Sequence, residues 1–259
     1  MTDLLDLART IATEAADLAV RRRREGVAVA ATKSTIVDVV TEADREVEEL
    51  VRGRIADARP QDGILGEEGG GQAGSSGLTW IVDPIDGTVN YLYGIPHYAV
   101  SIAVVEGEPD PQLWTALAGV VVNPPSGELF AAAAGGGATL GGRPIRVADP
   151  VPLELALVGT GFSYDAEARR RQGAVAAGLL PVVRDLRRMG AAALDLCAVA
   201  CGRLDAYFER GLAPWDHAAG ALIAREAGAV ALGARGARPD RELVLAAHPD
   251  LAAALAPLL

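Results

Sequence analysis

Apolar side chains recur every three or four positions over residues 2–26, and this spacing predicts a first amphipathic helix. A second helix fits residues 41–58, and a short apolar strand follows at residues 64–65. Residues 69–77 are rich in Gly and Ser, which predicts a mobile surface loop before the next strand, at residues 78–82.

From residue 97 to 146 the pattern changes to short apolar runs separated by turn sequences, as in a meander of antiparallel strands. The triple glycine at residues 135–137 lacks the lysine and the following helix of a nucleotide-binding loop, so we expect a hairpin turn there. Beyond residue 149 strand-like and helix-like segments alternate. They are expected at residues 155–159, 166–177, 182–186, 191–201, 205–208, 216–227, 243–246 and 250–258.

These patterns predict a layered α/β protein, of α+β character, with two sheets of which the first is largely antiparallel. We expect an N-terminal α+β half over residues 1–148 and a C-terminal α/β half over residues 149–259, packed as one compact unit. Apolar residues make up 50% of the chain and aromatic residues only 4%, so the core should consist of small aliphatic side chains.

The formal net charge of −10 restricts the choice of partners. Nucleic acid and anionic membrane surfaces bind clustered Lys and Arg, so we expect neither as a partner. Cys197 and Cys201 lie one helical turn apart and are typical of buried thiols in a reducing compartment. The N-terminus lacks the basic start and apolar block of a signal peptide, and we therefore predict a cytoplasmic protein.

Candidate chemistry begins where an apolar strand leads into a turn that holds Asp83 and Asp86. Pro84 lacks the N–H that a strand ladder uses, so we expect the strand to stop there and to leave Asp83 at its carboxyl end. Gly87 permits close approach of the backbone to a ligand, and Thr88 opens the next segment with N–H groups suited to phosphate. Two carboxylates delivered together with a backbone anion site have few purely structural uses.

Two further acidic residues stand at the ends of predicted elements, Glu67 after a strand and Asp216 before a helix. Taken alone, each has an ordinary explanation: an acidic loop for the first and a helix N-cap for the second. Together, the four carboxylates form a set of oxygen donors without a His or Cys cluster, which favours Mg²⁺ or a similar hard cation over zinc. Such charges repel one another unless cations lie between them.

Other hydrolytic arrangements fit less well. The three histidines, His97, His217 and His248, are scattered and belong to no serine-hydrolase elbow or zinc-protease helix. A covalent aspartyl-phosphatase of the haloacid dehalogenase type would carry a D-x-D motif, whereas Asp83 and Asp86 are separated by two residues. We therefore expect the nucleophile to be a water molecule activated by metal.

Over most of its length the chain resembles the inositol monophosphatase family, and residues 188–228 resemble the bacterial inositol-1-monophosphatase branch. The motifs that carry the likeness are Gly66-Glu67-Glu68, residues 80–91 and Pro214-Trp215-Asp216, in the family's order and at its spacing. The resemblance implies a layered αβαβα sandwich of the inositol monophosphatase and fructose-1,6-bisphosphatase type. It also implies a homodimer, Mg²⁺ as the cofactor at two or three ions per site, and a small phosphorylated polyol as the substrate.

The resemblance further implies roles for individual residues. The implied metal ligands are Glu67, Asp83, the carbonyl of Ile85, Asp86 and Asp216. The implied catalytic residues are Glu67, Thr88 and Asp44, of which Asp44 and Thr88 would orient or activate the attacking water. The implied substrate contacts are Asp86, Gly87, Thr88, Gly190, Ala191, Ala192 and Glu209.

Two of these positions, Asp44 and Ala191, have an additional feature in the sequence. Thr41 and Asp44 have capping-box spacing, so Asp44 also fits a purely structural role at a helix start. Ala191 departs from the Thr or Ser that many members of the family carry, which removes one polar contact to a ligand. By the same resemblance, Lys33 and Asp38 would shape the mouth of the site.

The sequence thus predicts an Mg²⁺-dependent phosphomonoesterase that hydrolyses inositol monophosphate to inositol and phosphate. Histidinol phosphate, fructose-1,6-bisphosphate and a nucleotide 3′-phosphate are alternative substrates for the same chemistry. The carboxylate of Glu209 would accept hydrogen bonds from vicinal hydroxyls and repel a second phosphate, which favours a monophosphate. An alternative of another class is a regulatory binding protein of the same fold that contacts transcription machinery.

Overall fold

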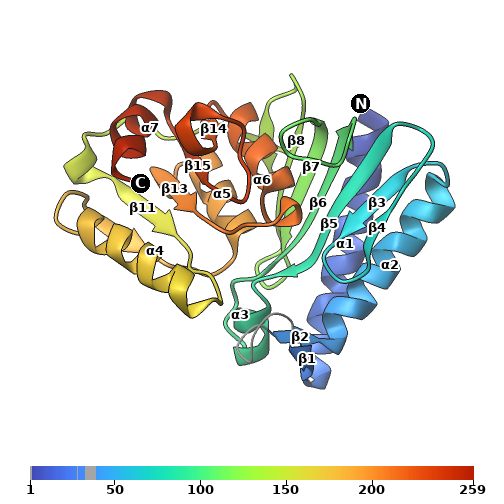
Figure 1. Ribbon diagram of the computed structural model, residues 1–259. Coiled ribbons are helices and arrows are strands. Elements are labelled where there is room, and N and C mark those ends of the chain that lie inside the picture. Colours follow the sequence, from blue (N-terminus) through green and yellow to red (C-terminus); the bar gives the residue numbers. More distant parts are fainter. Residues whose placement is uncertain (1, 28, 33–38) are drawn as a thin grey trace.

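The computed structural model describes residues 2–27, 29–32 and 39–259, and Lys33 and Asp38 lie outside these residues. Five layers of helices and sheets alternate across the molecule (Figure 1). The helix layers contain, from one side to the other, α1 (Thr2–Glu25) with α2 (Glu42–Ala58), α5 (Ala192–Ala200) with α6 (Pro214–Glu226), and α4 (Ala166–Leu179) with α7 (Pro249–Leu255). The predicted αβαβα sandwich is confirmed.

The first sheet has eight strands in the order β10-β9-β8-β7-β6-β5-β3-β4. In chain order they are β3 (Gly63–Gly66), β4 (Gly70–Gln72), β5 (Leu78–Asp86), β6 (Ala99–Glu106), β7 (Thr115–Asn123), β8 (Glu128–Ala133), β9 (Ala138–Leu140) and β10 (Arg143–Ile145). The β3–β5 pair is parallel and the other neighbouring pairs of this sheet are antiparallel. The predicted meander is confirmed, and the triple glycine forms the expected turn between β8 and β9.

The second sheet has five strands in the order β12-β11-β13-β15-β14. They are β11 (Leu157–Thr160), β12 (Asp185–Arg187), β13 (Ala206–Glu209), β14 (Val230–Leu232) and β15 (Val244–Ala247). The sequence pattern missed β14. It also missed the hairpin of β1 (Val29–Thr32) and β2 (Val39–Thr41), and the short 3-10 helices η1 (Leu153–Leu155) and η2 (Ala234–Gly236). These elements are too short to show a hydrophobic period. The predicted last helix, residues 250–258, corresponds to α7 followed by the 3-10 helix η3 (Ala256–Leu258).

The core consists of three apolar clusters: one between α1, α2 and the first sheet, one around α5 and α6 between the two sheets, and one between the second sheet and α4 and α7. Alternate residues of a strand point to opposite faces, so Trp80 packs against α1 and α2 while Ile81 packs toward α5 and α6. The central helices approach the first sheet closely, because a Cβ atom placed on Gly119 would lie 3.1 Å from the Cα atom of Ala219. Small side chains therefore let the middle layers pack tightly, as the composition suggested.

Two expectations about strand limits are wrong. β5 continues through Pro84 to Asp86, and its pairing with β6 shifts between Asp83, opposite Ser101, and Asp86, opposite Ala99. Such a bulge absorbs an extra residue and lets a proline stand where no ladder donor is needed. The segment at residues 69–77 is not entirely a loop, because β4 pairs with β3 within it. Its glycines carry no side chain that could have signalled a strand.

Within the described residues, none of the helices combines the length and the apolar composition that crossing a bilayer requires.

Candidate active site

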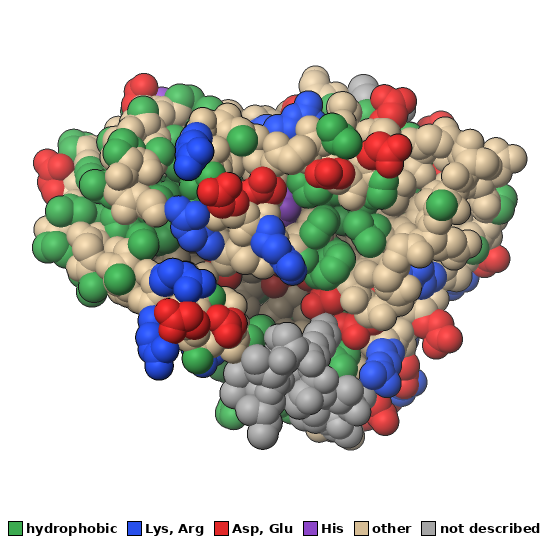
Figure 2. Space-filling model, in the orientation of Figure 1, with side chains coloured by type: hydrophobic (Ala, Val, Ile, Leu, Met, Phe, Trp, Pro, Cys, Tyr) green, Lys and Arg blue, Asp and Glu red, His purple; other side chains and the backbone are tan. Residues whose placement is uncertain are grey.

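A cavity of about 380 Å³ opens between the ends of the two sheets. In Figure 2 the molecule has a hollow on the face shown, with acidic and basic side chains beside it. Of the residues predicted for the site, those that line the cavity are Glu67, Asp83, Ile85, Asp86, Gly87, Thr88, Gly190, Ala192, Glu209 and Asp216. The chain thus brings together residues that are up to 149 positions apart in the sequence, from Glu67 to Asp216.

Two predicted residues do not line the cavity. Ala191 is buried at the start of α5, where its methyl group packs close to Gly87. Asp44 is fully buried behind Thr88. Both therefore lie one layer behind the wall, and any effect on a ligand would pass through their neighbours.

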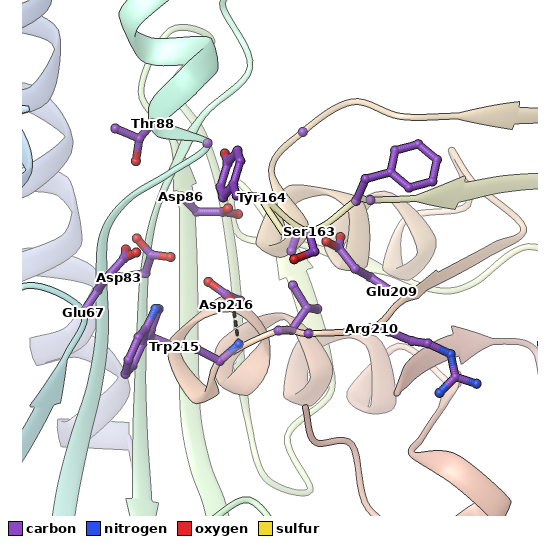
Figure 3. Close-up of a pocket in the computed structure, with 18 of the residues that line it drawn as sticks. Glu67, Asp83, Asp86, Thr88, Ser163, Tyr164, Glu209, Arg210, Trp215 and Asp216 are labelled. Atoms are coloured by element: carbon purple, nitrogen blue, oxygen red, sulfur yellow. Dashed lines mark hydrogen bonds between the residues drawn. The ribbon is translucent and has the colours of Figure 1, made fainter. Parts of the chain in front are cut away.

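Four carboxylates face the acidic end of the cavity (Figure 3). Burial raises the pKa of Asp83 well above its usual range, and the negative charges of Glu67 and Asp86 raise it further. Burial likewise raises the pKa of Asp86, with a contribution from Asp216. The pKa of Asp216 rises to about 8, chiefly through burial and then through the charge of Glu67. Like charges crowded together in this way favour bound protons or a bound cation.

Three of the acidic side chains hold fixed orientations because one oxygen of each accepts a backbone N–H. Asp83 Oδ1 lies 3.1 Å from the nitrogen of Ile85, and Asp86 Oδ2 lies 2.7 Å from the nitrogen of Ala193. Asp216 Oδ2 lies 2.6 Å from the nitrogen of Ala213. Each of these contacts fixes the direction in which the second oxygen of the carboxylate faces.

The position of Asp216 differs slightly from a simple N-cap. Ala213 is the N-cap of α6, and Asp216 is the third helical residue, whose carboxylate accepts the N–H of the N-cap. The same contact that begins the helix therefore aims the other carboxylate oxygen at the cavity (Figure 3).

This donor set fits a hard cation. Among the described residues, no group of three or more His, Cys, Asp or Glu side chains is already arranged to hold a metal ion. The Asp83 carboxyl group instead lies within hydrogen-bonding reach of Glu67 and Asp216. A shared proton relieves the same repulsion that a cation would relieve. Carboxylates and the Ile85 carbonyl, with no imidazole or thiolate beside them, match the ligand preference of Mg²⁺.

Thr88 begins the short helix α3 (Thr88–Tyr93) and lies between two acceptors. Its Oγ1 is 3.1 Å from Asp44 Oδ1 and 3.2 Å from the carbonyl oxygen of Ile85. The other oxygen of Asp44 accepts the N–H of Thr41 at 2.8 Å, so the capping box is present as well. Both roles weighed for Asp44, the cap and the contact with Thr88, are therefore compatible. Burial raises the pKa of Asp44 to about 6.

Glycine is required where the two halves of the cavity wall meet. Gly87 has φ of 91°, in the left-handed region that favours glycine, and a Cβ atom on it would lie 3.0 Å from the carbonyl oxygen of Gly190. Asn90 of α3 reinforces this contact, because its Nδ2 donates to the carbonyl oxygens of His97 at 2.7 Å and Met189 at 2.8 Å. The start of α3 is thereby held against the loop before α5.

The opposite end of the cavity is built around Glu209. Its Oε2 accepts a hydrogen bond from the Tyr207 hydroxyl at 2.5 Å. Burial raises the pKa of Glu209 to about 6, although Tyr207 and the guanidinium of Arg188 act in the opposite direction. Gly161 leaves room for this carboxylate, because a methyl group there would overlap it. Gly161 and Phe162 thus border the cavity.

Sequence reasoning missed several residues of the wall. The cavity is also lined by Ser163, Tyr164, Arg188, Arg210, Trp215 and Arg241. Trp215 stands next to Asp216 in a motif, and Arg188 begins the stretch with a family likeness, so both could have been found. Arg210 and Arg241 belong to no motif, and only the fold brings them to the site.

The layered αβαβα fold is shared with solved structures of SuhB and of inositol monophosphatase. A profile of the inositol monophosphatase family matches residues 1–259. The inositol-1-monophosphatase of Mycobacterium leprae is 47% identical over 270 residues, which cover 96% of this chain and 90% of that protein. The chain therefore belongs to the inositol monophosphatase family, as its motifs predicted.

Two further relatives differ in name from the first. The crystal structure of the extragenic suppressor protein SuhB from Bartonella henselae has a TM-score of 0.91 at 33% identity, and the match covers 99% of this chain and 98% of that one. The Nus factor SuhB of Xylella fastidiosa is 45% identical over 207 residues, 79% of this chain and 72% of that protein. The relatives thus include proteins named inositol-1-monophosphatase and proteins named Nus factor or suppressor protein SuhB.

Proposed function

We propose that the protein is an Mg²⁺-dependent phosphomonoesterase that hydrolyses inositol monophosphate to inositol and phosphate. The observation that carries this proposal is the set of four carboxylates at one end of the cavity, three of them oriented by backbone N–H groups. The name of the Mycobacterium leprae relative supports the same activity.

The acidic end would bind the cofactor. Its ligands would be Glu67, Asp83, Asp86, Asp216 and the carbonyl of Ile85, shared among two or three Mg²⁺ ions. When bound, Mg²⁺ supplies positive charge that lowers the pKa of a nearby water and stabilises the negative charge of the phosphoryl and leaving oxygens.

The chain's own groups would orient the substrate and the attacking water. The hydroxyl of Thr88 would accept a hydrogen bond from the water beside Glu67, and as it takes a proton from that water it would pass its own proton to the Asp44 carboxylate, to which it already donates. The N–H groups of Gly87 and Thr88 have no acceptor within their short helix and would bind the phosphate oxygens. Glu209 at the far end would accept hydrogen bonds from hydroxyls of the ring, next to Gly190 and Ala192, with Ala191 behind them.

A second candidate substrate has a specific observation in its favour. Arg188, Arg210 and Arg241 line the cavity on the side of Glu209, and guanidinium groups bind phosphate well. Fructose-1,6-bisphosphate or another ester with a second anionic group would use them. Arg210 is already occupied, since it donates to the carbonyl oxygens of Glu242 and Leu259, each at 2.8 Å. The monophosphate therefore remains our first choice.

The assay that tests the proposal compares four substrates with the purified protein in Mg²⁺. We expect inositol-1-phosphate to give the highest kcat/KM, ahead of histidinol phosphate, fructose-1,6-bisphosphate and a nucleotide 3′-phosphate. If inositol-1-phosphate were the slowest of the four, the substrate assignment would fail. Phosphatase activity that survived in Asp83→Asn would refute the metal assignment, because that change removes a bridging charge.

A regulatory role is the candidate of another class, and the name of the Xylella fastidiosa relative favours it. The oriented carboxylates favour an enzyme, yet one chain can serve both roles. Association with transcription complexes, measured for the wild type and for Asp83→Asn, separates them: binding that survives the loss of catalysis would indicate a second, independent function.

We also propose that the protein is a cytoplasmic homodimer. Within each subunit, residues 1–148 would carry most of the metal ligands, and residues 149–259 would carry Asp216 and the contacts with the substrate ring. We expect the protein to bind neither nucleic acid nor membranes directly, because the net charge is −10. Light scattering of the purified protein tests the dimer, and a monomer would overturn that part of the proposal.

A further inference from the structure

Glu48 on α2 is a buried carboxylate behind the segment that carries Glu67. The residue is 2% exposed and lies one helical turn after Asp44. Its Oε2 accepts the N–H of Glu68 at 2.8 Å, and its Oε1 accepts the N–H of Gly69 at 2.7 Å. One side chain therefore binds two consecutive amides directly after Glu67.

Arg52, one turn further along α2, completes this arrangement. Its Nε donates to Glu48 Oε1 at 2.7 Å, and its Nη2 donates to the carbonyl oxygen of Gly70 at 2.5 Å. The two side chains together, which we name the Glu48–Arg52 clasp, bind both N–H and C=O groups of residues 68–70. Arg52 also balances the charge of Glu48, so the clasp adds no net negative charge next to four carboxylates.

The chain around Glu67 is shaped to accept the clasp. A Cβ atom on Gly66 would lie 2.5 Å from Glu48 Oε1, and one on Gly69 would lie 2.7 Å from the same atom. Only glycine lets the carboxylate come this close to the backbone. On the other side, the N–H of Glu67 donates to the carbonyl oxygen of Val82 at 3.2 Å, next to Asp83.

We infer that Glu48, supported by Arg52, is a positioning residue that fixes the backbone of Glu67 so that its carboxylate is aimed at the bound cation. This role rests on the proposed metal site. Groups that orient a metal ligand from behind typically change metal affinity by about 10–100-fold when they are replaced. Helix α2 would thereby position two groups of the proposed site: Thr88, through Asp44, and Glu67, through Glu48.

The test measures Mg²⁺ binding to the metal-free full-length protein by calorimetry, for the wild type, Glu48→Gln and Glu49→Gln. The amide of Glu48→Gln keeps one acceptor but directs an NH₂ group at the second backbone N–H. We expect its Mg²⁺ affinity to fall at least about tenfold. Glu49→Gln changes an exposed carboxylate on the same helix and should leave the affinity unchanged.

A second readout separates positioning from mere stability. In Glu48→Gln the Mg²⁺ concentration for half-maximal activity should rise by the same factor as the dissociation constant, with kcat largely restored at saturating Mg²⁺. A folded Glu48→Gln that binds Mg²⁺ as tightly as the wild type would overturn the inference. If the wild type bound no Mg²⁺, the metal assignment would fail, and the positioning role with it.

If Glu48→Gln does not fold, Gly69→Ala provides the same test without removing a buried charge. The added methyl carbon would lie 2.7 Å from Glu48 Oε1 and 2.8 Å from Arg52 Nε, and it would push the clasp away from the loop. We again expect Mg²⁺ affinity to fall at least about tenfold. An unchanged affinity in this variant would overturn the inference.

Discussion

The hydroxyl of Thr88 lies 3.1 Å from Oδ1 of Asp44, although the two residues are 44 positions apart in the chain. Asp44 cannot turn away, because its other oxygen accepts the N–H of Thr41. A helix cap on α2 therefore fixes the orientation of a hydroxyl at the start of α3. The capping box at the start of α2 is thereby connected to the proposed chemistry at Thr88.

Replacing Thr88 by Val should lower kcat by roughly 10²–10⁴, the range in which a positioned proton-transfer group contributes, while KM changes little. Val keeps the shape of the side chain and removes only the hydroxyl. Thr88→Ser keeps the hydroxyl and should recover most of the activity. Steady-state kinetics at saturating Mg²⁺ measure both variants, and a Thr88→Val enzyme as fast as the wild type would exclude Thr88 from proton transfer.

Gly161→Ala should raise KM and leave kcat within about threefold of the wild type, because loss of uniform binding acts on KM alone. The added methyl group would overlap the carboxylate of Glu209 and force it to another rotamer. Gly173 has open space around its Cβ position, so Gly173→Ala is a matched control with unchanged kinetics. A fall in kcat with constant KM would instead place Gly161 in the catalytic step.

The stability of the metal-free protein should depend on pH through Glu209. Its pKa in the folded protein is about 6, above the ordinary value of 4.5, so the folded state favours the protonated form. That contribution is complete below pH 4.5 and is lost as the pH rises through about 6. Between pH 4.5 and 7 the free energy of unfolding of the wild type should therefore fall by up to about 2 kcal/mol relative to that of Glu209→Gln. This figure follows from the difference between a pKa of about 6 and the ordinary value of 4.5.

Urea unfolding in EDTA at the two pH values measures this difference directly. The comparison with Glu209→Gln cancels the other carboxylates that titrate in the same range. A difference between the two proteins that did not change with pH would show that Glu209 is solvated in the folded state.

The sequence was most informative where a long pattern or a dense motif existed. The periods of α1 and α2 and the meander of the first sheet were recognisable because burial of one face imposes a spacing on the residues. The motif at residues 80–88 gave Asp83, Asp86, Gly87 and Thr88 before any fold was known. The proposed ligands Glu67 and Asp216 were ambiguous alone and gained weight only as members of a set.

The sequence did not reveal site residues that lie far from every motif along the chain. Arg241 and Ser163 reach the cavity only because the second sheet orders its strands out of sequence. Pro84 misled because the rule that proline ends a strand does not apply at a bulge, where no ladder donor is required. The two hydrogen bonds of Glu48 to the loop after Glu67 likewise leave no mark on a single sequence.

Because acidic groups are crowded around Asp83, we expect its replacement by Asn to stabilise the metal-free fold and to abolish the activity. In the metal-free protein the Asp83 carboxyl group is fully buried beside Glu67, Asp86 and Asp216, and the raised pKa of Asp83 means that a negative charge on it destabilises the fold. Asp83→Asn removes that charge, and the amide oxygen can still accept the N–H of Ile85. We therefore expect Asp83→Asn to raise the Tm in EDTA by at least about 2 °C.

The same change should remove the response to metal. Mg²⁺ binds only the folded wild type and should raise its Tm in proportion to the logarithm of concentration. Asp83→Asn should show little or no such increase and should lose phosphatase activity. Thermal unfolding of both proteins with EDTA and with Mg²⁺ tests the two effects together. A variant less stable than the wild type in EDTA would mean that the carboxylates are not in repulsion, and that the cavity does not need a cation.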